Sequence, residues 1–574
     1  MRIASALRSS LVRSSARAYL ARRLTVEQKL WIRRLRWREH PWQHRQRRLR
    51  RELAARRGGD PVLVSGRPAK ILTGPFDARA ELFTSLRVVR ETLSQAHVEF
   101  VELPRLEDWA PTLCIRAGDL GRTVDALREL PTTEGWCLEY TDLQGRKIAA
   151  PAVEQRLPKI AGVRAYRRLL GPNGRQLSTR SEHVCVEPWD VLGPGVDRVD
   201  GSVHVEGTVH RRIQRRGELV EYFTPQAWRE TVEDHGSTAH LPAPHLLRLT
   251  EPVDIVYTWV DGRDPAWQQR KRAAQGELAP EEIHATAANH SRYASRDELR
   301  YSLRSVEYYA SWVNHIYLVT DRQIPEWLDT SHPKITVVDH REIFADPSVL
   351  PVFNSHAIES QLHHIEGLSE HYIYCNDDFM FLRPTCPEMF FTSNGLSKFF
   401  PSTAPLDPAP PSVRDVPVLA AAKRNRQFMV DEHRRAVTNK FKHTPHPQLR
   451  SVMSEFEASH QEMFDAVAAS RFRHPMDYSI AAALYHFHAH ALGRAIVGSI
   501  AYTYVDIGRQ DAALLLERLK QRHDLDVVTL NDTHVDETEE DTVAARLAHF
   551  LDDRFPCPSS FEMDGPASPS SHLS

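Results

Sequence analysis

Apolar runs of five or six residues, each ending in polar or acidic side chains, recur between residues 250 and 380. They cover residues 255–260, 315–320, 335–339 and 371–375, and an amphipathic helical pattern over residues 296–309 separates the first two. Buried strands that alternate with helices predict an α/β domain with a parallel sheet. Because such sheets present ligands at the carboxyl ends of their strands, the polar residues after each run predict one crevice at that edge.

A second alternating pattern precedes this domain. Strands are expected at residues 61–65, 97–103, 112–118 and 136–142, and helices at 79–95 and 121–130. The pattern predicts a smaller accessory α/β domain over residues 61–250, without a catalytic constellation of its own. Residues 401–420 are rich in Pro and Ser and are expected to form a loop or lid, and residues 564–574 a disordered tail.

Charge separates a third unit at the N-terminus. Residues 1–60 carry 18 Lys and Arg against 4 Asp and Glu, although the 574-residue chain has a net charge of only −1. Apolar side chains interleave with the arginines, which predicts a basic, amphipathic helical segment that contacts an anionic membrane. A nucleic-acid-binding arm, a solvated tail and an organelle presequence are alternatives.

Cysteine usage and hydropathy indicate the compartment. The six cysteines are widely spaced and form no Cys-x-x-Cys pair, which suits a reducing environment. No apolar run of membrane-spanning length appears, and arginines interrupt the region where a secretory signal would lie. We therefore expect a cytoplasmic protein, with peripheral contact at the inner face of the cell membrane.

The main candidate site follows the strand predicted at residues 371–375. Asp377 and Asp378 are adjacent there, and two such carboxylates repel each other unless a cation or backbone N–H groups compensate. This favours a metal-bound diphosphate, although an ordinary turn explains the same residues. Asn531 and Asp532 end another predicted strand.

Other strand ends and helices supply weaker candidates. Asp261 and Gly262 end the first strand and could offer a carboxylate and approachable N–H groups to a nucleotide, or be a plain turn. Arg300 and Arg304 lie one turn apart on the helix predicted at residues 296–309, where a solvated face is the alternative. Asn425 enters a further predicted helix.

Histidines form two further groups. Asn354 is expected to cap a helix that carries Glu359, His363 and His364, a set that resembles metal ligands, although a surface pair explains the same spacing. His443 begins a His-x-Pro-His turn near lysines, which suits either a phosphate site or an exposed helix end.

Four sequence blocks, in this order, resemble the Stealth family. They are DIVYTWVDG; DELRYSLRSVE with HIYLVTDRQIPEWL and FNSHAIESQLHHIEGLSEHYIYCNDD; NKFKHTPH with RFRHPMDYS; and LNDT with RFPCPSSFE. The family comprises bacterial capsular and exopolysaccharide phosphotransferases and the animal GlcNAc-1-phosphotransferase. The resemblance covers residues 251–563 and implies a Rossmann-like nucleotide-sugar-binding catalytic domain.

The resemblance implies transfer of a hexose 1-phosphate from a nucleotide sugar such as UDP-GlcNAc to a hydroxyl of a growing polysaccharide, with release of the nucleoside monophosphate. Mg²⁺ or Mn²⁺ is expected as the cofactor. The animal enzyme's Cys-rich modules are absent from this sequence, which favours a glycan acceptor.

The resemblance also assigns residue roles. Asp377 and Asp378 match the metal-binding and catalytic pair, and His443 and Arg473 match catalytic residues. His443 would take the acceptor's proton, and a covalent phosphohistidine is the alternative. Asn531 and Asp532 complete the expected metal set. Substrate binding is assigned to Asp254, Trp259, Asp261, Gly262, Arg300, Glu359 and Asn425.

Two other functions compete with this one. A metal-dependent glycosyltransferase would use the same donor but release the nucleoside diphosphate, and strand-end acids alone do not separate the two reactions. A nucleic-acid-binding protein would act through residues 1–60. Residues 61–250 could also be a partner-binding module.

Overall fold

The computed structural model describes residues 28–33, 44, 48–49, 62–64, 66–179, 181–195, 204–213, 219–234, 236–277, 293–532 and 539–563. Most of the expected membrane-contacting segment, residues 1–60, and all of the expected tail, residues 564–574, lie outside these ranges. Residues 28–33 are helical, with Leu30 buried and Trp31 63% exposed. No helix in the described ranges combines the length and apolar character needed to cross a bilayer.

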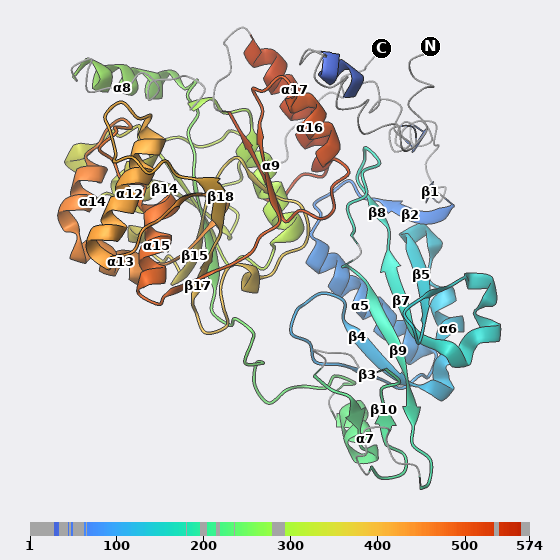
Figure 1. The fold of residues 1–574 in the computed structure, drawn as a ribbon. Helices are drawn as coiled ribbons and strands as arrows, with labels where there is room; N and C mark the ends of the chain where they lie inside the picture. The colour runs from blue at the N-terminus through green and yellow to red at the C-terminus, as the bar shows by residue number, and fades with distance from the viewer. Residues whose placement is uncertain are drawn as a thin grey trace, which may run out of the picture.

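The N-terminal part is a mixed α/β unit, seen in blue to green in Figure 1. Its main sheet has the order β11-β10-β9-β7-β5-β6, with β4 pairing to β9 and β3 to β4. Its elements are β1 (Val62–Val64), β2 (Arg67–Ile71), α5 (Ala78–Gln95), β3 (Phe100–Glu102), β4 (Thr112–Arg116), α6 (Leu120–Arg128), β5 (Trp136–Asp142), β6 (Lys147–Ile148), β7 (Ile160–Arg167), β8 (Leu169–Leu170), β9 (Val184–Val191), β10 (Val209–His210), β11 (Tyr222–Phe223) and α7 (Pro225–Asp234).

Helix α5 was predicted from the sequence at residues 79–95, and its cap and buried face explain why the pattern was correct. The Asp77 side chain accepts hydrogen bonds from the backbone N–H groups of Arg79 and Ala80 and so caps the helix. Leu86, Val89 and Leu93 recur at helical spacing and are buried in the core beneath the sheet.

The second part contains the predicted parallel sheet. Its order is β14-β13-β12-β15-β20, in which the first four strands are parallel and β20 is antiparallel to β15. These strands are β12 (Val253–Thr258), β13 (Ile316–Thr320), β14 (Ile335–Asp339), β15 (His371–Asn376) and β20 (His446–Leu449). The four strands predicted from the apolar runs are therefore confirmed, and their carboxyl ends meet at one edge.

Helices cover both faces of this sheet, because successive residues of each strand point to opposite sides. Ile255 and Tyr257 belong to the core that contains α9, whereas Val256 belongs to the core beneath α11. The helices are α8 (Pro265–Gly276), α9 (Glu298–Tyr309), α10 (His340–Ile343), α11 (Ser355–Glu359), α12 (Pro417–His433), α13 (Arg450–Ser459), α14 (Gln461–Ala468), α15 (Tyr485–Ala491), α16 (Ala512–Leu519) and α17 (Glu540–Arg554).

A smaller sheet with the order β16-β23-β22 adjoins the first. Its strands are β16 (Phe379–Phe381), β22 (Tyr502–Asp506) and β23 (Val527–Asn531), while β17 (Ser397–Phe399) pairs with β21 (Ala495–Val497) and β18 (Pro401–Pro405) with β19 (Asn439–Phe441). The turn formed by Asp377 and Asp378 connects β15 to β16 and thus stands where the two sheets meet.

Two expectations about local structure were wrong. Asn354 does cap a helix, but α11 ends at Glu359, and His363 and His364 lie in a separate 3₁₀ turn. Both imidazoles contact Glu457 of α13, so tertiary contacts override the helical spacing. Residues 401–405 form the edge strand β18, a position that tolerates proline, and only residues 406–416 form the expected loop.

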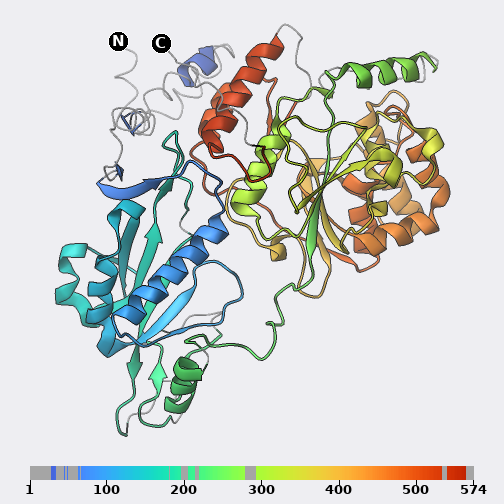
Figure 2. The same cartoon turned by 180° about the vertical axis from the view of Figure 1, so that it is seen from behind.

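The N-terminal part packs against α9, α16 and α17 (Figures 1 and 2). The ring of Phe76 meets that of Tyr308 edge-on at 5.0 Å, and Phe76 is fully buried in the core of the second part. The Arg175 guanidinium donates to the Lys520 carbonyl at 2.7 Å. All six cysteines are unpaired in the structure.

Candidate functional site

Asp377 and Asp378 stand at the carboxyl end of β15, against the carboxyl end of β23. The amide of Asn531 donates to Asp378 Oδ2 at 3.0 Å, and the Leu530 backbone N–H donates to the Asp378 carbonyl at 3.0 Å. Two segments more than 150 residues apart in sequence are therefore joined at this turn. The predicted Asp377, Asp378 and Asn531 do lie together.

His443 completes this group from the segment between β19 and β20. Its Nε2 lies 3.5 Å from Asp378 Oδ2, and its side chain is 33% exposed. Thr529 donates to the His443 carbonyl at 2.7 Å, and the ring of Phe379 packs edge-on against the imidazole. The imidazole is thus held beside the acid pair while remaining accessible to solvent.

Two residues that the sequence analysis missed, Arg296 and Glu298, flank the start of α9. The Arg296 guanidinium donates to Asp532 Oδ2 at 2.7 Å, and its side chain is almost completely buried. Glu298 is also buried, and the burial raises its pKa to about 7. Asp297 between them has a left-handed backbone (φ 64°), which is uncommon for a residue other than glycine and often marks a functional site.

The electrostatics of the site are dominated by uncompensated carboxylates. Burial raises the pKa of Asp377 well above its usual range, and the nearby charges of Glu298 and Asp378 raise it further. Burial also raises the pKa of Asp532, while Arg296 opposes this shift. A bound cation would relieve this repulsion.

Unpartnered polar atoms support the same conclusion. Asp378 Oδ1, Asp532 Oδ1 and His443 Nε2 are buried and make no hydrogen bond to any residue that the structure describes. Carboxylate oxygens without partners, beside an Asn side chain, are the ligand type that hard divalent cations prefer. Asp377, Asp378 and Asp532 are farther apart than the ligands of a bound ion would be. Among the described residues, three potential ligand atoms of His, Cys, Asp or Glu lie within 4.8 Å of one another only at His363, His364 and Glu457.

Arg473 and Glu359 form a second group at the same edge. The Arg473 guanidinium donates to the hydroxyl of Ser355 at the start of α11. Glu359 is buried, and its Oε2 has no hydrogen-bond partner among the described residues. Burial raises the pKa of Tyr374, the charge of Glu359 raises it further and that of Arg473 lowers it. The Tyr374 hydroxyl contacts Thr258 Oγ1 at 3.2 Å. Since Thr258 pairs with Asn376, this group adjoins the acid pair.

Three predicted substrate-binding residues serve other contacts. Asp254 lies near the amino end of β12, where its carboxylate accepts from Asn314 and from the Ser369 backbone N–H. Arg300 contacts Glu562. Asn425 is buried in α12, donates to the Ser479 carbonyl and leaves its own amide oxygen unpartnered.

Trp259, Asp261 and Gly262 follow β12 at the expected edge, but their backbone N–H groups are already used. They donate to the Val319 carbonyl, the Gln323 side chain and the Tyr293 carbonyl, respectively. A Cβ at Gly262 would lie 2.4 Å from the Tyr293 carbonyl oxygen. Close packing against Tyr293 therefore explains this glycine.

Family comparisons agree with this arrangement. Models of the four conserved regions of Stealth proteins match in order: conserved region 1 at residues 251–279, region 2 at 292–399, region 3 at 442–490 and region 4 at 517–569. The acid pair lies in region 2, His443 and Arg473 in region 3, and Asn531 and Asp532 in region 4. The site thus draws on three of the four regions.

Curated relatives extend the similarity beyond these regions. Exopolysaccharide phosphotransferase SCO2594 of Streptomyces coelicolor is 47% identical over 85% of this chain and 85% of its own length. SCO6023 of the same species, with the same descriptive name, is 48% identical over 54% of this chain and 52% of its own length. Exopolysaccharide phosphotransferase CpsY of Mycobacterium tuberculosis is 32% identical over 88% of this chain and 93% of its own length.

Among solved structures, the galactosyltransferase LgtC in complex with donor and acceptor sugar analogues aligns at 12% identity and a TM-score of 0.27. The alignment covers 52% of this chain and 95% of LgtC. This similarity is too low to support an argument about the site. The four ordered regions and the relatives that match over most of their length show that the chain belongs to the Stealth family.

Proposed function

We propose that this chain is an exopolysaccharide phosphotransferase that moves a hexose 1-phosphate from a UDP-GlcNAc-like donor to a hydroxyl of a growing polysaccharide. Phosphotransferase activity follows from its family. The observation that carries the proposal is the placement of His443 Nε2 3.5 Å from Asp378 Oδ2, beside Asp377 and Asn531. A general base and a charge-neutralising centre are the two parts that this reaction requires.

In the proposed reaction, His443 Nε2 removes the proton from the acceptor hydroxyl. The hydroxyl oxygen then bonds to the β-phosphorus of the donor, and the bond from that phosphorus to the bridging oxygen breaks. The products are a phosphodiester on the glycan and the nucleoside monophosphate. The Asp378 carboxylate, 3.5 Å from His443 Nε2, stabilises the imidazolium that forms.

The phosphates need positive charge around them. Asp377, Asp378, Asn531 and Asp532 are the proposed holders of Mg²⁺ or Mn²⁺, and the unpartnered oxygens of Asp378 and Asp532 fit such an ion. Once bound, the ion would neutralise charge on the transferring phosphoryl group. Arg473 is the proposed guanidinium contact, because it lies in the group next to the acid pair, whereas Arg300 is already paired with Glu562.

The strand order supports a Rossmann-like donor-binding domain. After β12, the chain adds β13 and β14 on one side of it and then β15 on the other. The topological switch point therefore lies between β12 and β15, and ligands of such sheets bind at that point. Trp259 and Asp261 follow β12 there and are proposed donor contacts, with Gly262 and Glu359 shaping the wall. Asp254 and Asn425 would support the site from outside it.

The nucleotide product tests the proposal. Purified protein with Mg²⁺ or Mn²⁺ and an oligosaccharide acceptor is incubated with a panel of nucleotide sugars, because a wrong donor would mimic inactivity. Release of UMP, or of another nucleoside monophosphate, supports the proposal, and Asp378→Asn serves as the inactive control. Release of the diphosphate would identify the enzyme as a glycosyltransferase.

The basic N-terminal segment suggests where the enzyme works. We propose that residues 1–60 dock the cytoplasmic enzyme on anionic lipid at the inner face of the membrane, in keeping with the 18 basic residues there. Deletion of residues 1–60 should reduce binding to anionic vesicles and leave catalysis on a free oligosaccharide intact. Loss of catalysis with unchanged vesicle binding would contradict this role.

A further inference from the structure

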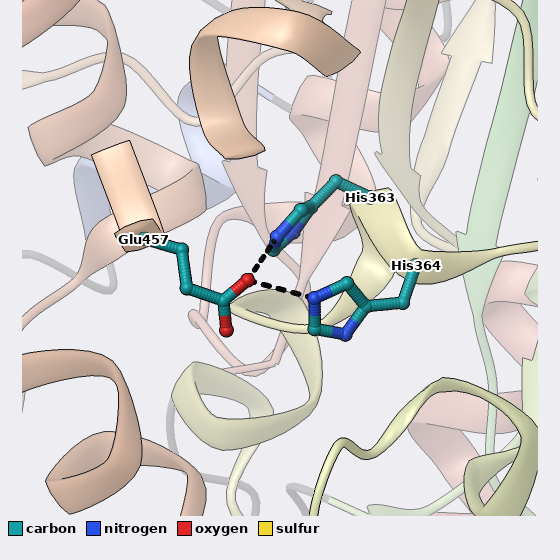
Figure 3. Close-up of side chains that lie close together, drawn as sticks. All are labelled: His363, His364 and Glu457. Atoms are coloured by element: carbon teal, nitrogen blue, oxygen red, sulfur yellow. Dashed lines mark hydrogen bonds and ion pairs between the residues drawn. The ribbon is translucent and has the colours of Figure 1, made fainter. Parts of the chain in front are cut away.

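Two neighbouring histidines and a glutamate form a compact cluster away from the acid pair. His363 and His364 lie in the 3₁₀ turn before β15, and Glu457 lies on α13 (Figure 3). The turn precedes the amino end of β15, whereas Asp377 and Asp378 follow its carboxyl end. The cluster is therefore separate from the proposed phosphotransfer site.

Both imidazoles converge on one carboxylate oxygen. His363 Nε2 and His364 Nε2 each lie 2.7 Å from Glu457 Oε2 (Figure 3). His363 is almost completely buried, Glu457 is 11% exposed and His364 is 27% exposed. Within the described residues this is the only group of three potential metal ligands within 4.8 Å of one another.

The hydrogen bond on the far side of His364 fixes its tautomer. His364 Nδ1 lies 2.8 Å from the Ile343 carbonyl oxygen, which can only accept, so Nδ1 carries a hydrogen. In the neutral ring, Nε2 then carries no hydrogen, and its lone pair faces a carboxylate oxygen. That contact is repulsive unless a proton or a cation lies between the two atoms. A backbone carbonyl that fixes the remote nitrogen is also the usual partner of a metal-binding histidine.

The other two side chains are enclosed by the surrounding protein. The His363 side chain is 1% exposed and that of Glu457 is 11% exposed, so an ion between them would be shielded from bulk water on that side. Arg450 is the nearest opposing cation, but its guanidinium is bound to the His363 and Leu368 carbonyls.

We propose that His363, His364 and Glu457 bind a divalent transition-metal ion of the zinc class. Two imidazole nitrogens and one carboxylate oxygen form a three-residue set that zinc uses, and water reaching the exposed edge of His364 would be the fourth ligand. Tetrahedral coordination places ligand atoms about 3.3 Å apart, so the present 2.7 Å contacts open by roughly half an ångström when the ion enters.

The ion would cross-link two conserved regions. His363 and His364 lie within region 2, and Glu457 lies within region 3. Region 2 supplies Asp377 and Asp378, and region 3 supplies His443 and Arg473. A metal cross-link before the amino end of β15 would thus hold the two halves of the proposed active site in register without contacting substrate.

Zinc uptake by the full-length protein tests this inference. Metal-free protein is equilibrated with Zn²⁺, dialysed against a weak chelator and analysed for metal content. We expect one retained zinc per chain that is lost in His364→Gln and in Glu457→Gln, with affinity lowered at least about 100-fold. Glu457→Gln keeps an acceptor oxygen for the imidazoles, so the loss would reflect the missing charge, and circular dichroism checks the fold.

Two matched variants must retain the zinc. His460→Gln alters a histidine that faces Glu432 at 3.6 Å, a pair outside the cluster. Asp378→Asn alters the proposed phosphotransfer site, so it separates this metal from a catalytic one. Co²⁺ in place of Zn²⁺ should give the intense visible absorption of a four-coordinate site. Equal zinc content in the folded His364→Gln and unaltered proteins would overturn the inference and leave an imidazolium–carboxylate pair.

Discussion

At the scale of single residues, His443 is the most informative position, because its imidazole is partly exposed and its Nε2 lies near Asp378 without a hydrogen bond to any described residue. His443→Ala should lower kcat by about 10²- to 10⁴-fold, the usual contribution of a general base. Donor affinity, measured by calorimetry, should be nearly unchanged. A weakened affinity with little change in kcat would make His443 a substrate ligand.

Glu298 allows a prediction about pH. Its pKa is about 7 in the folded protein, against 4.5 as its ordinary value, so the folded state holds the proton more tightly than the unfolded state. The stability that this provides is present below pH 4.5 and is lost as pH rises through 7. Relative to Glu298→Gln, the metal-free protein should lose up to about 3 kcal/mol across this range.

Urea unfolding of both proteins at several pH values in excess chelator measures this difference. A saturating concentration of Mg²⁺ should reduce it, because the ion would favour the ionised carboxylates. A stability difference that is independent of pH would show that Glu298 titrates normally.

The candidate residues illustrate what a sequence can and cannot show at this scale. Asp377 and Asp378 were predictable because adjacent acids at a strand end leave a local signal. Arg296 and Glu298 were missed, since only the pairing of Arg296 with Asp532, far away in sequence, brings them to the site. The clue available was an Arg-Asp-Glu run at the start of an amphipathic helical pattern.

At the scale of elements, the loop after β12 contains Gly262, which packs too closely against neighbouring backbone for a larger residue. Gly262→Ala would place a methyl group 2.4 Å from the Tyr293 carbonyl oxygen, a backbone atom that cannot rotate away. We expect a loss of about 1–3 kcal/mol in the free energy of unfolding, the usual cost of overpacking. Gly276→Ala at the end of α8 meets nothing within 4 Å and should be neutral or slightly stabilising.

Urea unfolding checks both glycine variants. Equal stability of Gly262→Ala and Gly276→Ala would mean that the loop relaxes freely, and the close approach to Tyr293 would then have no energetic role.

Strands were predicted better than the segments around them. Buried parallel strands have a continuous apolar pattern, so β12, β13, β14 and β15 were each found. The turn that carries His363 and His364 was expected to continue the helix, because periodicity alone does not reveal Glu457 nearly a hundred residues later. Arg300 was likewise predicted to bind substrate, but in the structure it pairs with Glu562, more than 250 residues later in the sequence.

At the scale of the whole molecule, the N-terminal part contributes to the core of the second part. Phe76 precedes α5 but is buried against Tyr308 of α9. Phe76→Ala should therefore destabilise the second part by about 3–5 kcal/mol and lower the temperature at which transferase activity is lost. Phe83→Ala, at a position on α5 that is 36% exposed, should cost about 1 kcal/mol or less.

Thermal inactivation of transferase activity, recorded for both variants, checks this prediction. The same inactivation temperature for Phe76→Ala and the unaltered protein would show that the two parts are energetically independent.

The fate of the donor's β-phosphorus distinguishes transfer of a sugar 1-phosphate from transfer of the sugar alone. UDP-GlcNAc, or the active donor from the panel, is labelled with ³²P at the β-phosphate and incubated with the enzyme, a divalent metal and an oligosaccharide. Our account predicts that the label appears on the glycan in a phosphodiester and that unlabelled UMP is released. Label that remains on released UDP, with only sugar on the glycan, would contradict it.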